Sequence, residues 1–373
     1  PAFWQHLVNF TVGLGVTGTL TELPSGAQSW PDPTATDAKK IDDLWHAAVN
    51  SRGSFFSASD PAAFSNALTN ALTAIISRTG SASAGAANTN SLKTNGGIYQ
   101  AKFNSGDWSG QLLSIPFGPA GILATTEWNA GAVSLSPSVI NPASRVMITK
   151  GSSDGVTFQY ANLTTARKTY IDKNASGTVD NCGVERIAYL RGTATQENSA
   201  GTFTCASSTA INKFRVRSTS KLGDIVNSGP MFVGKPSAGF SDVDHSGYAA
   251  FKNNYKDRLP MIYVGANDGI LHGFTACIVG VTPGCTPSAP GKGLLAYVPS
   301  HVYSNLSRLT DKDYNASHRY FADGSPMVGD IYSSSTSSWR TILVGGLNGG
   351  GQGFYALNVT NPSDAAKSDP VFS

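Results

Sequence analysis

The sequence predicts a mainly β chain of β-propeller type, preceded by a small α/β segment. Three observations indicate this class. Past residue 92, short runs of β-branched and aromatic residues alternate with turns rich in Gly, Asn, Asp and Ser. Helical periodicity is confined to the first 80 residues. Several of the later runs form strand–turn–strand units with Gly and aromatic residues, which favours propeller blades, with a β-sandwich as the alternative.

The amino-terminal segment carries one predicted strand and two predicted helices. Residues 4–16 alternate as a strand does, and residues 37–50 have helical periodicity. The apolar face of that helix is formed by Ile41, Leu44, Trp45, Ala48 and Val49. A second helix starts after Asp60, which can cap it, with Pro61 in the first turn, and ends at Gly80. These elements are typical of an α/β domain.

Composition then places a boundary and a set of hairpins. Residues 81–91 are small and polar, which predicts a linker, and residues 92–373 are predicted to form a partial set of blades. Asn-Asp-Gly, Asp-Gly and other glycine-containing turns supply the positive-φ residues that hairpins need. Four hairpins are expected: 98–101 with 112–113, 147–149 with 156–158, 262–265 with 271–274, and 342–345 with 354–357.

Charge and hydropathy argue against nucleic-acid binding and against a membrane span. The net charge is only +3, and in the densest basic cluster Lys213, Arg215 and Arg217 alternate with apolar residues, which is a poor phosphate track. No run approaches the 18 or so apolar residues of a membrane span. The sequence opens on Pro1 without an initiator Met, so we expect the gene, and any export signal, to begin upstream.

The four cysteines, Cys182, Cys205, Cys277 and Cys285, contain no C-x-x-C pair, which argues against a zinc site. In an oxidising compartment two local disulfides, Cys182–Cys205 and Cys277–Cys285, are the preferred interpretation. Four cysteines allow three connectivities, so the pairing remains open at this point.

One segment has the start of a calcium-loop pattern. Oxygen-bearing side chains occupy its positions 1, 3, 5 and 9: Asp172, Asn174, Ser176 and Asp180. Gly177 stands at position 6, but position 12 is Gly183 where a calcium loop has a bidentate Glu. We therefore predict calcium ligands here, with a polar hairpin turn as the alternative. Residues 242–247 repeat part of the pattern and favour a solvated loop.

Three segments resemble the PilY family of type IV pilus tip proteins. They are residues 258–274, which contain Val-Gly-Ala-Asn-Asp-Gly, residues 343–360, and residues 189–192. His272 follows the tight turn of the first segment, and we expect a hydrogen-bonded histidine within a blade. The first 80 residues resemble the closing strand and helices of the von Willebrand factor A-like domain that precedes the propeller in such proteins.

The resemblance implies an extracellular protein at the pilus tip and outer surface of a Gram-negative bacterium. Such a protein binds minor pilins, contacts host or abiotic surfaces, opposes pilus retraction and is not an enzyme. The family's main calcium loop is expected beyond residue 373. Two alternatives stay open: a quinoprotein-like dehydrogenase, whose propeller has the same architecture, and a stand-alone sugar-binding propeller.

Overall fold

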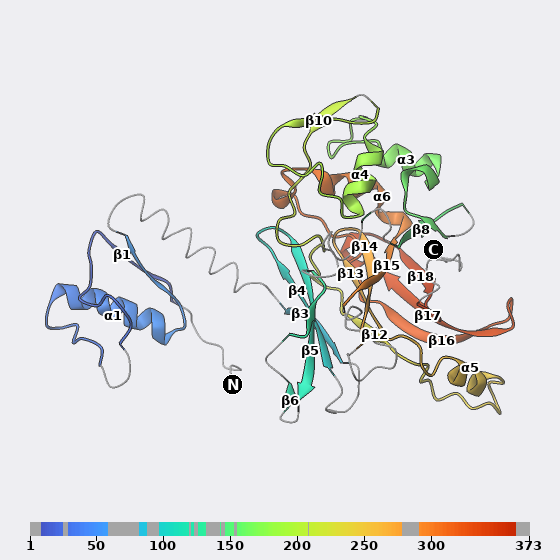
Figure 1. Ribbon diagram of the computed structural model, residues 1–373, viewed down its shortest axis with the longest axis horizontal. Coiled ribbons are helices and arrows are strands. Elements are labelled where there is room, and N and C mark those ends of the chain that lie inside the picture. Colours follow the sequence, from blue (N-terminus) through green and yellow to red (C-terminus); the bar gives the residue numbers. More distant parts are fainter. Residues whose placement is uncertain are drawn as a thin grey trace. The chain divides into compact units, whose positions relative to one another are not determined.

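A computed structural model describes residues 9–24, 29–58, 82–87, 97–118, 121–122, 126–131, 142, 146–152, 155–207, 209–277 and 291–362 (Figure 1). The chain divides into two compact units, residues 1–79 and 80–373. This division lies next to the boundary that the small-residue composition predicted.

The first unit contains a parallel strand–helix–strand arrangement. Strand β1 (Thr11–Leu14) pairs in parallel with β2 (Phe55–Ala58), and helix α1 (Asp37–Asn50) lies between them in sequence. Parallel neighbours need such a crossover. Helix α1 starts after Thr36, whose side-chain oxygen accepts a hydrogen bond from the backbone N–H of Lys39. The helix predicted over residues 37–50 is confirmed.

The apolar face of α1 is only partly covered. Ala48 is fully buried, and the Trp45 ring stacks on Phe55 of β2 with centroids 5.7 Å apart. Leu44 and Val49, which we predicted on the same buried face, are 39% and 37% exposed. The helix therefore packs along a narrower stripe than its periodicity predicts.

Other expectations for the amino-terminal segment meet the described residues only in part. Strand β1 covers part of the run predicted over 4–16. Residues 4–8 of that run lie outside the described residues, as does the helix predicted after Asp60. Residues 82–87 were predicted within a linker and instead form a paired strand. Composition alone does not distinguish a strand of small residues from a flexible linker. The von Willebrand factor A-like assignment stays a prediction.

Three β-sheets form the body of the second unit. The first sheet contains β3 (Ala82–Ala87), β4 (Gly97–Asn104), β5 (Ser109–Gly118), β6 (Gly121–Ile122) and β7 (Trp128–Asn129). The central sheet has the order β12 (Met231–Val233), β13 (Met261–Ala266), β14 (Ile270–Thr275), β15 (Gly293–Val298), β8 (Met147–Lys150) and β9 (Gly155–Thr157). The third sheet contains β16 (Met327–Ser333), β17 (Ser338–Gly346) and β18 (Phe354–Asn358). All four predicted hairpins are confirmed as β4–β5, β8–β9, β13–β14 and β17–β18.

The arrangement of these sheets has features of a propeller. Strands β12 to β15 form an antiparallel meander, which is the unit that propeller blades repeat. Strand β12 contacts β3 and β16. Each of these three strands lies at one edge of its sheet. In the part of the chain that the structure describes, the sheets do not close into a ring (Figure 1).

The central sheet is buried on both faces because strand side chains alternate. Along β13, Tyr263 joins the core shared with the third sheet, whereas Ile262 and Val264 join the core shared with the first sheet. The Tyr297 and Tyr355 rings meet 5.2 Å apart in the first of these cores, and Tyr99 of β4 lies in the second. A strand covered on both faces reads as a continuous apolar run, as β13 does.

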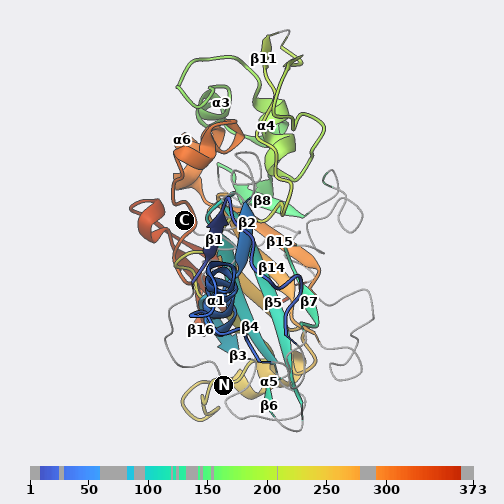
Figure 2. The same ribbon diagram turned by 90° about the vertical axis from the view of Figure 1, so that its left-hand side faces the viewer.

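Short helices lie at opposite ends of the sheets (Figures 1 and 2). At one end are α3 (Thr165–Ile171), α4 (Gly183–Leu190), α6 (Tyr303–Leu306) and the hairpin β10 (Thr202–Thr204)–β11 (Ala210–Asn212); α5 (Tyr248–Asn254) is at the other. Single 3₁₀ turns occupy Tyr160–Asn162, Ser300–Val302, Ser307–Thr310, Tyr314–Ala316 and Asn348–Gly350. Confining helices to the first 80 residues was therefore wrong. Helices of seven or eight residues are too short to show periodicity and depend on tertiary packing. No helix among the described residues is long and apolar enough to cross a membrane.

Candidate functional site

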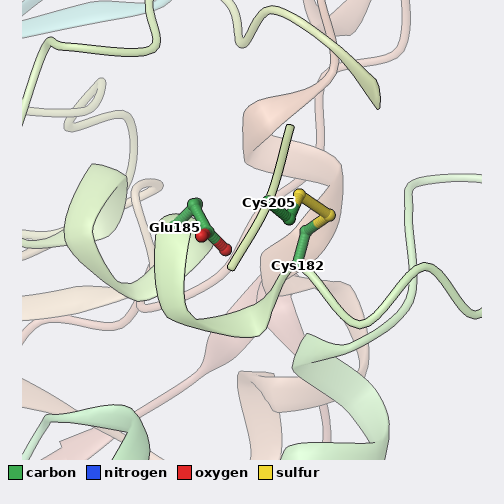
Figure 3. A group of neighbouring side chains, drawn as sticks. All are labelled: Cys182, Glu185 and Cys205. Carbon is green, nitrogen blue, oxygen red and sulfur yellow. A yellow bond between two sulfur atoms is a disulfide. The ribbon is translucent and has the colours of Figure 1, made fainter. Parts of the chain in front are cut away.

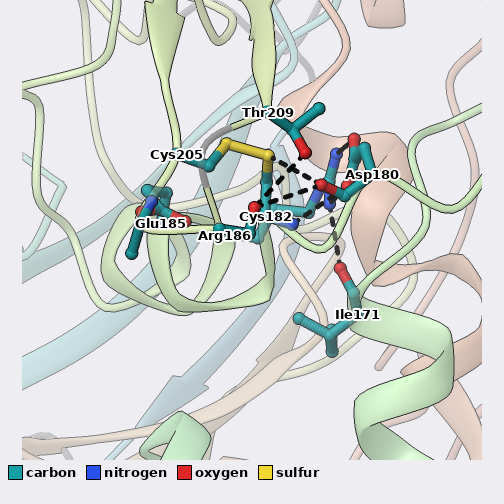
Figure 4. Close-up of a disulfide and its surroundings, with 9 residues drawn as sticks. Ile171, Asp180, Cys182, Glu185, Arg186, Cys205 and Thr209 are labelled. Carbon is teal, nitrogen blue, oxygen red and sulfur yellow. Dashed lines mark hydrogen bonds and ion pairs between the residues drawn. A yellow bond between two sulfur atoms is a disulfide. The ribbon is translucent and has the colours of Figure 1, made fainter.

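The four predicted calcium ligands and two of the four cysteines lie in a small lobe, residues 160–217, which we call the disulfide lobe. Cys182 at the start of α4 is bonded to Cys205, which follows β10, so the bond ties the helix to the hairpin (Figure 4). This pairing was the preferred one and is confirmed. Cys277 is also disulfide-bonded. The fourth cysteine, Cys285, lies outside the described residues.

Glu185 stands beside this disulfide, and its carboxylate and the two sulfur atoms lie within 4.8 Å of one another (Figure 3). Thiolates bind metal ions, but sulfur atoms joined in a disulfide have no thiolate to offer. Glu185 Oε1 accepts a hydrogen bond from the backbone N–H of Ala206 at 2.8 Å. The group is therefore a structural brace of the hairpin and not a metal centre.

A buried ion pair lies next to the disulfide. Arg186 is 1% exposed and Asp180 is 7% exposed, and both carboxylate oxygens of Asp180 accept hydrogen bonds from the guanidinium (Figure 4). Arg186 Nη1 also donates to the backbone oxygen of Ile171 at 3.0 Å. A bidentate pair of this kind satisfies the charge of Asp180 within the lobe.

The predicted calcium ligands have different partners in the structure. Asp172 Oδ2 accepts a hydrogen bond from the Tyr160 hydroxyl at 2.7 Å, and burial together with this carboxylate raises the pKa of Tyr160 to about 12. The other oxygen of Asp172, Oδ1, is buried with no donor among the described residues. Asn174 Oδ1 accepts from the backbone N–H and the hydroxyl of Ser176, as in a turn closed by its own side chain.

A cavity of about 380 Å³ adjoins this loop and the β10–β11 hairpin. Asn174, Ser176 and Asp180 line it, and so do Lys213 and Lys312. The two lysines and Arg186, the partner of Asp180, oppose a cation in this cavity. Asp172, whose Oδ1 has no donor among the described residues, is not part of the cavity lining. Calcium binding by this loop therefore stays a prediction.

The Asn267-Asp268-Gly269 turn is a second cluster of polar side chains. His272 Nε2 lies 3.0 Å from Asp268 Oδ2, and the same oxygen accepts a hydrogen bond from the backbone N–H of Gly223 at 3.0 Å. His272 is 1% exposed. The expected hydrogen bond of this histidine is confirmed, and His272 lies in strand β14.

Asp224 extends this cluster to a distant segment. Its Oδ2 accepts a hydrogen bond from Asn267 Nδ2 at 2.7 Å and lies 2.9 Å from His318 Nε2. The Trp108 ring stacks on His318 with centroids 3.6 Å apart, and Asn267 Oδ1 accepts from the backbone N–H of Phe321. Sequence reasoning missed Asp224 and His318 because they are 94 residues apart and carry no local motif. We call Asp224, Asn267, Asp268, His272 and His318 the polar clamp, because their contacts join the β13–β14 turn to the segments around residues 224 and 318.

Arg217 of the predicted basic cluster, together with the neighbouring Lys221, binds a carboxylate within the fold. Arg217 donates to Glu197 Oε1, and its guanidinium lies 3.5 Å from the centre of the Tyr189 ring. Lys221 binds the same carboxylate. Burial raises the pKa of Glu197, but these two cations outweigh it and hold the pKa below its ordinary value.

Comparison with known proteins follows the same division of the chain. The PilY1 beta-propeller domain matches residues 222–370, which contain the Asn267-Asp268-Gly269 turn and strands β12 to β18. Strands β8 and β9 of the central sheet precede the matched region. The type IV pilus biogenesis factor PilY1 of Pseudomonas aeruginosa strain PAK is 32% identical over 98% of this chain. The chain belongs to the PilY1 family. It spans 32% of the length of that relative.

Further relatives agree with the PilY1 assignment. A PilY1 homolog of Xylella fastidiosa is 33% identical over 83% of this chain, which covers 22% of the homolog. The crystal structure of the Pseudomonas aeruginosa PilY1 C-terminal domain is 31% identical, covers 37% of this chain and 24% of that chain, and superposes with a TM-score of 0.25. A TM-score this low carries no argument about the fold. In this chain the disulfide lobe precedes the matched residues 222–370, and the polar clamp lies within them.

Proposed function

We propose that this chain is an extracellular part of a type IV pilus biogenesis factor, acting at the pilus tip and outer surface of a Gram-negative bacterium. The observation that carries the proposal is the alignment of 98% of the chain with PilY1 pilus biogenesis factors. The Cys182–Cys205 disulfide supports an oxidising compartment. In this role the protein binds minor pilins at the tip, contacts host or abiotic surfaces, and opposes pilus retraction without enzymatic turnover.

The first test is genetic. Deletion of the gene is expected to abolish surface pili, counted by electron microscopy, and twitching of the same cells, and the intact gene should restore both. Unchanged piliation and twitching after deletion would overturn the proposal. Turnover of an alcohol with added pyrroloquinoline quinone and a dye acceptor would instead support the quinoprotein alternative.

A matched pair of glycine variants ties the phenotype to the sheets of this chain. A Cβ at Gly265 in β13 would collide with the backbone oxygen of Ala322, whereas a Cβ at Gly329 in β16 meets nothing within 4 Å. Gly265→Val should therefore fail to restore pili, and Gly329→Val should restore them. Restoration by both variants at equal protein levels would show that this sheet is dispensable for the role.

A further inference from the structure

An open cavity of about 500 Å³ lies at the end of the molecule that carries α5. It is built by the connection between β12 and β13, residues 234–260. Three exposed lysines line it, Lys235, Lys252 and Lys256, and the described residues of its lining include no carboxylate. A site with three ammonium groups and no acid favours an anionic ligand.

An aromatic ring forms another part of the same cavity. Phe240 lines it and is 39% exposed. Its ring is held by the rings of Trp339, 5.4 Å away, Tyr248, 5.1 Å away, and His245, 4.6 Å away. An exposed Phe with three aromatic neighbours is a fixed apolar surface for a flat ligand face.

Hydrogen bonds attach this connection to the third sheet. The Tyr248 hydroxyl donates to Asp330 Oδ2 at 2.6 Å and accepts from the backbone N–H of Ala238. Trp339 Nε1 donates to the backbone oxygen of Ser246 at 3.0 Å. Burial, together with the Asp330 carboxylate, raises the pKa of Tyr248 to about 12, so the hydroxyl keeps its proton at physiological pH. The cavity is thus pre-formed, which lowers the entropic cost of binding.

We infer that this cavity, the basic groove, binds an acidic polysaccharide. Sugar rings offer C–H faces that pack on Phe240, and their carboxylate or sulfate groups would pair with the three lysines. The volume lies within the range of about 300–1,000 Å³ that is usual for ligand sites, which is enough for a short oligosaccharide. Three lysines around one short helix are too few to track a nucleic acid backbone.

This inference deepens the proposed contact with surfaces and rests on it only for its biological setting. Binding is measured on the purified chain, whereas the pilus role is measured by piliation. Absence of polysaccharide binding would overturn only this inference, and unchanged piliation after gene deletion would overturn only the proposed pilus role.

The test is biolayer interferometry with three immobilised polymers: polygalacturonate, dextran sulfate and neutral dextran. We expect the chain to bind one or both acidic polymers and not dextran, with affinity falling as salt rises. The first two polymers distinguish carboxylate from sulfate recognition. Absence of binding to both acidic polymers would overturn the inference.

Two triple variants separate the groove from net charge. Lys235→Ala/Lys252→Ala/Lys256→Ala should weaken binding about tenfold. This estimate assumes that each lysine contributes the binding free energy of roughly one exposed ion pair. The control combines alanine substitutions at Lys40, Lys168 and Lys292, which removes the same charge outside the groove and should leave affinity unchanged. Equal weakening by both variants, or equally tight binding of duplex DNA, would show only a general attraction to polyanions.

A variant of the aromatic ring tests the sugar contact itself. Phe240→Ala should weaken binding about threefold to tenfold while leaving its salt dependence unchanged, because no charge is lost. An unaltered affinity would remove the sugar-ring contact from the argument and overturn the polysaccharide assignment.

Discussion

Replacing Arg186 by Met removes one member of the buried pair in the disulfide lobe and keeps a side chain of similar length. In the wild-type structure both oxygens of Asp180 accept hydrogen bonds from Arg186, which also donates to the backbone oxygen of Ile171. The variant leaves the Asp180 carboxylate 7% exposed and without its cation. Among the described residues, this carboxylate has one other hydrogen bond, from the Cys182 backbone N–H at 3.1 Å.

The expected loss of stability is large. Removing one member of a buried ion pair costs about 3–5 kcal/mol, since the remaining charge stays desolvated. A typical domain is stable by only about 5–15 kcal/mol, so this loss is a large share of the total. Asp180→Leu together with Arg186→Met removes both charges and should recover part of the loss, because no unpaired charge remains buried.

Urea unfolding, followed by circular dichroism and by limited proteolysis of the lobe, measures these differences. Arg319→Met, at an exposed position, is the matched control and should change stability by less than about 0.5 kcal/mol. Two results would refute the reasoning: an Arg186→Met variant as stable as the control, or a double variant no more stable than the single one.

Three further predictions concern the same lobe. Cys182→Ala/Cys205→Ala should lower the free energy of unfolding by about 3 kcal/mol, which is the loop-closure entropy for a separation of 23 residues. Urea unfolding curves should then no longer respond to reductant at this site. A loss below about 1 kcal/mol would contradict this prediction. Glu197→Gln should cost about 2 kcal/mol at neutral pH. Because the pKa of Glu197 is lowered in the fold, that difference should shrink as the pH falls below the unfolded value of about 4.3 and on through the folded value; a difference independent of pH would exclude this origin. If the loop that starts at Asp172 binds calcium, millimolar calcium should raise the melting temperature, and Asp172→Asn should abolish the rise; no rise in the wild type would end the calcium prediction.

How far the sequence predicts this fold depends on the range of the interactions. The β13–β14 hairpin was predictable because Asn267-Asp268-Gly269 fixes the turn and Gly269 has a φ of 86°. Helix α1 was predictable because fourteen residues carry its periodicity. Helix α4 was not, since its eight residues are held by the Cys182–Cys205 bond and by packing against neighbouring segments.

The candidate sites divide in the same way. The spacing of Asp172, Asn174, Ser176 and Asp180 predicted ligands from a local pattern. Sequence could not show that Asp180 is taken by Arg186, because charge pairing depends on the direction in which two side chains point. The same holds for Asp224 and His318, which are 94 residues apart in the sequence and adjacent only in the folded chain.

The parallel pairing of β15 with β8 has a consequence for the order of folding. Strand β8 is made early, yet its partner comes much later: the Thr149 hydroxyl donates to the backbone oxygen of Val298, 149 residues further along the chain. Until residue 298 has been synthesised, the β8–β9 hairpin has an open edge that can pair with another chain. Closing so long a loop is slow, so docking of β8 onto β15 is expected late in folding. A growing chain therefore carries this unpaired, aggregation-prone edge until β15 has been made.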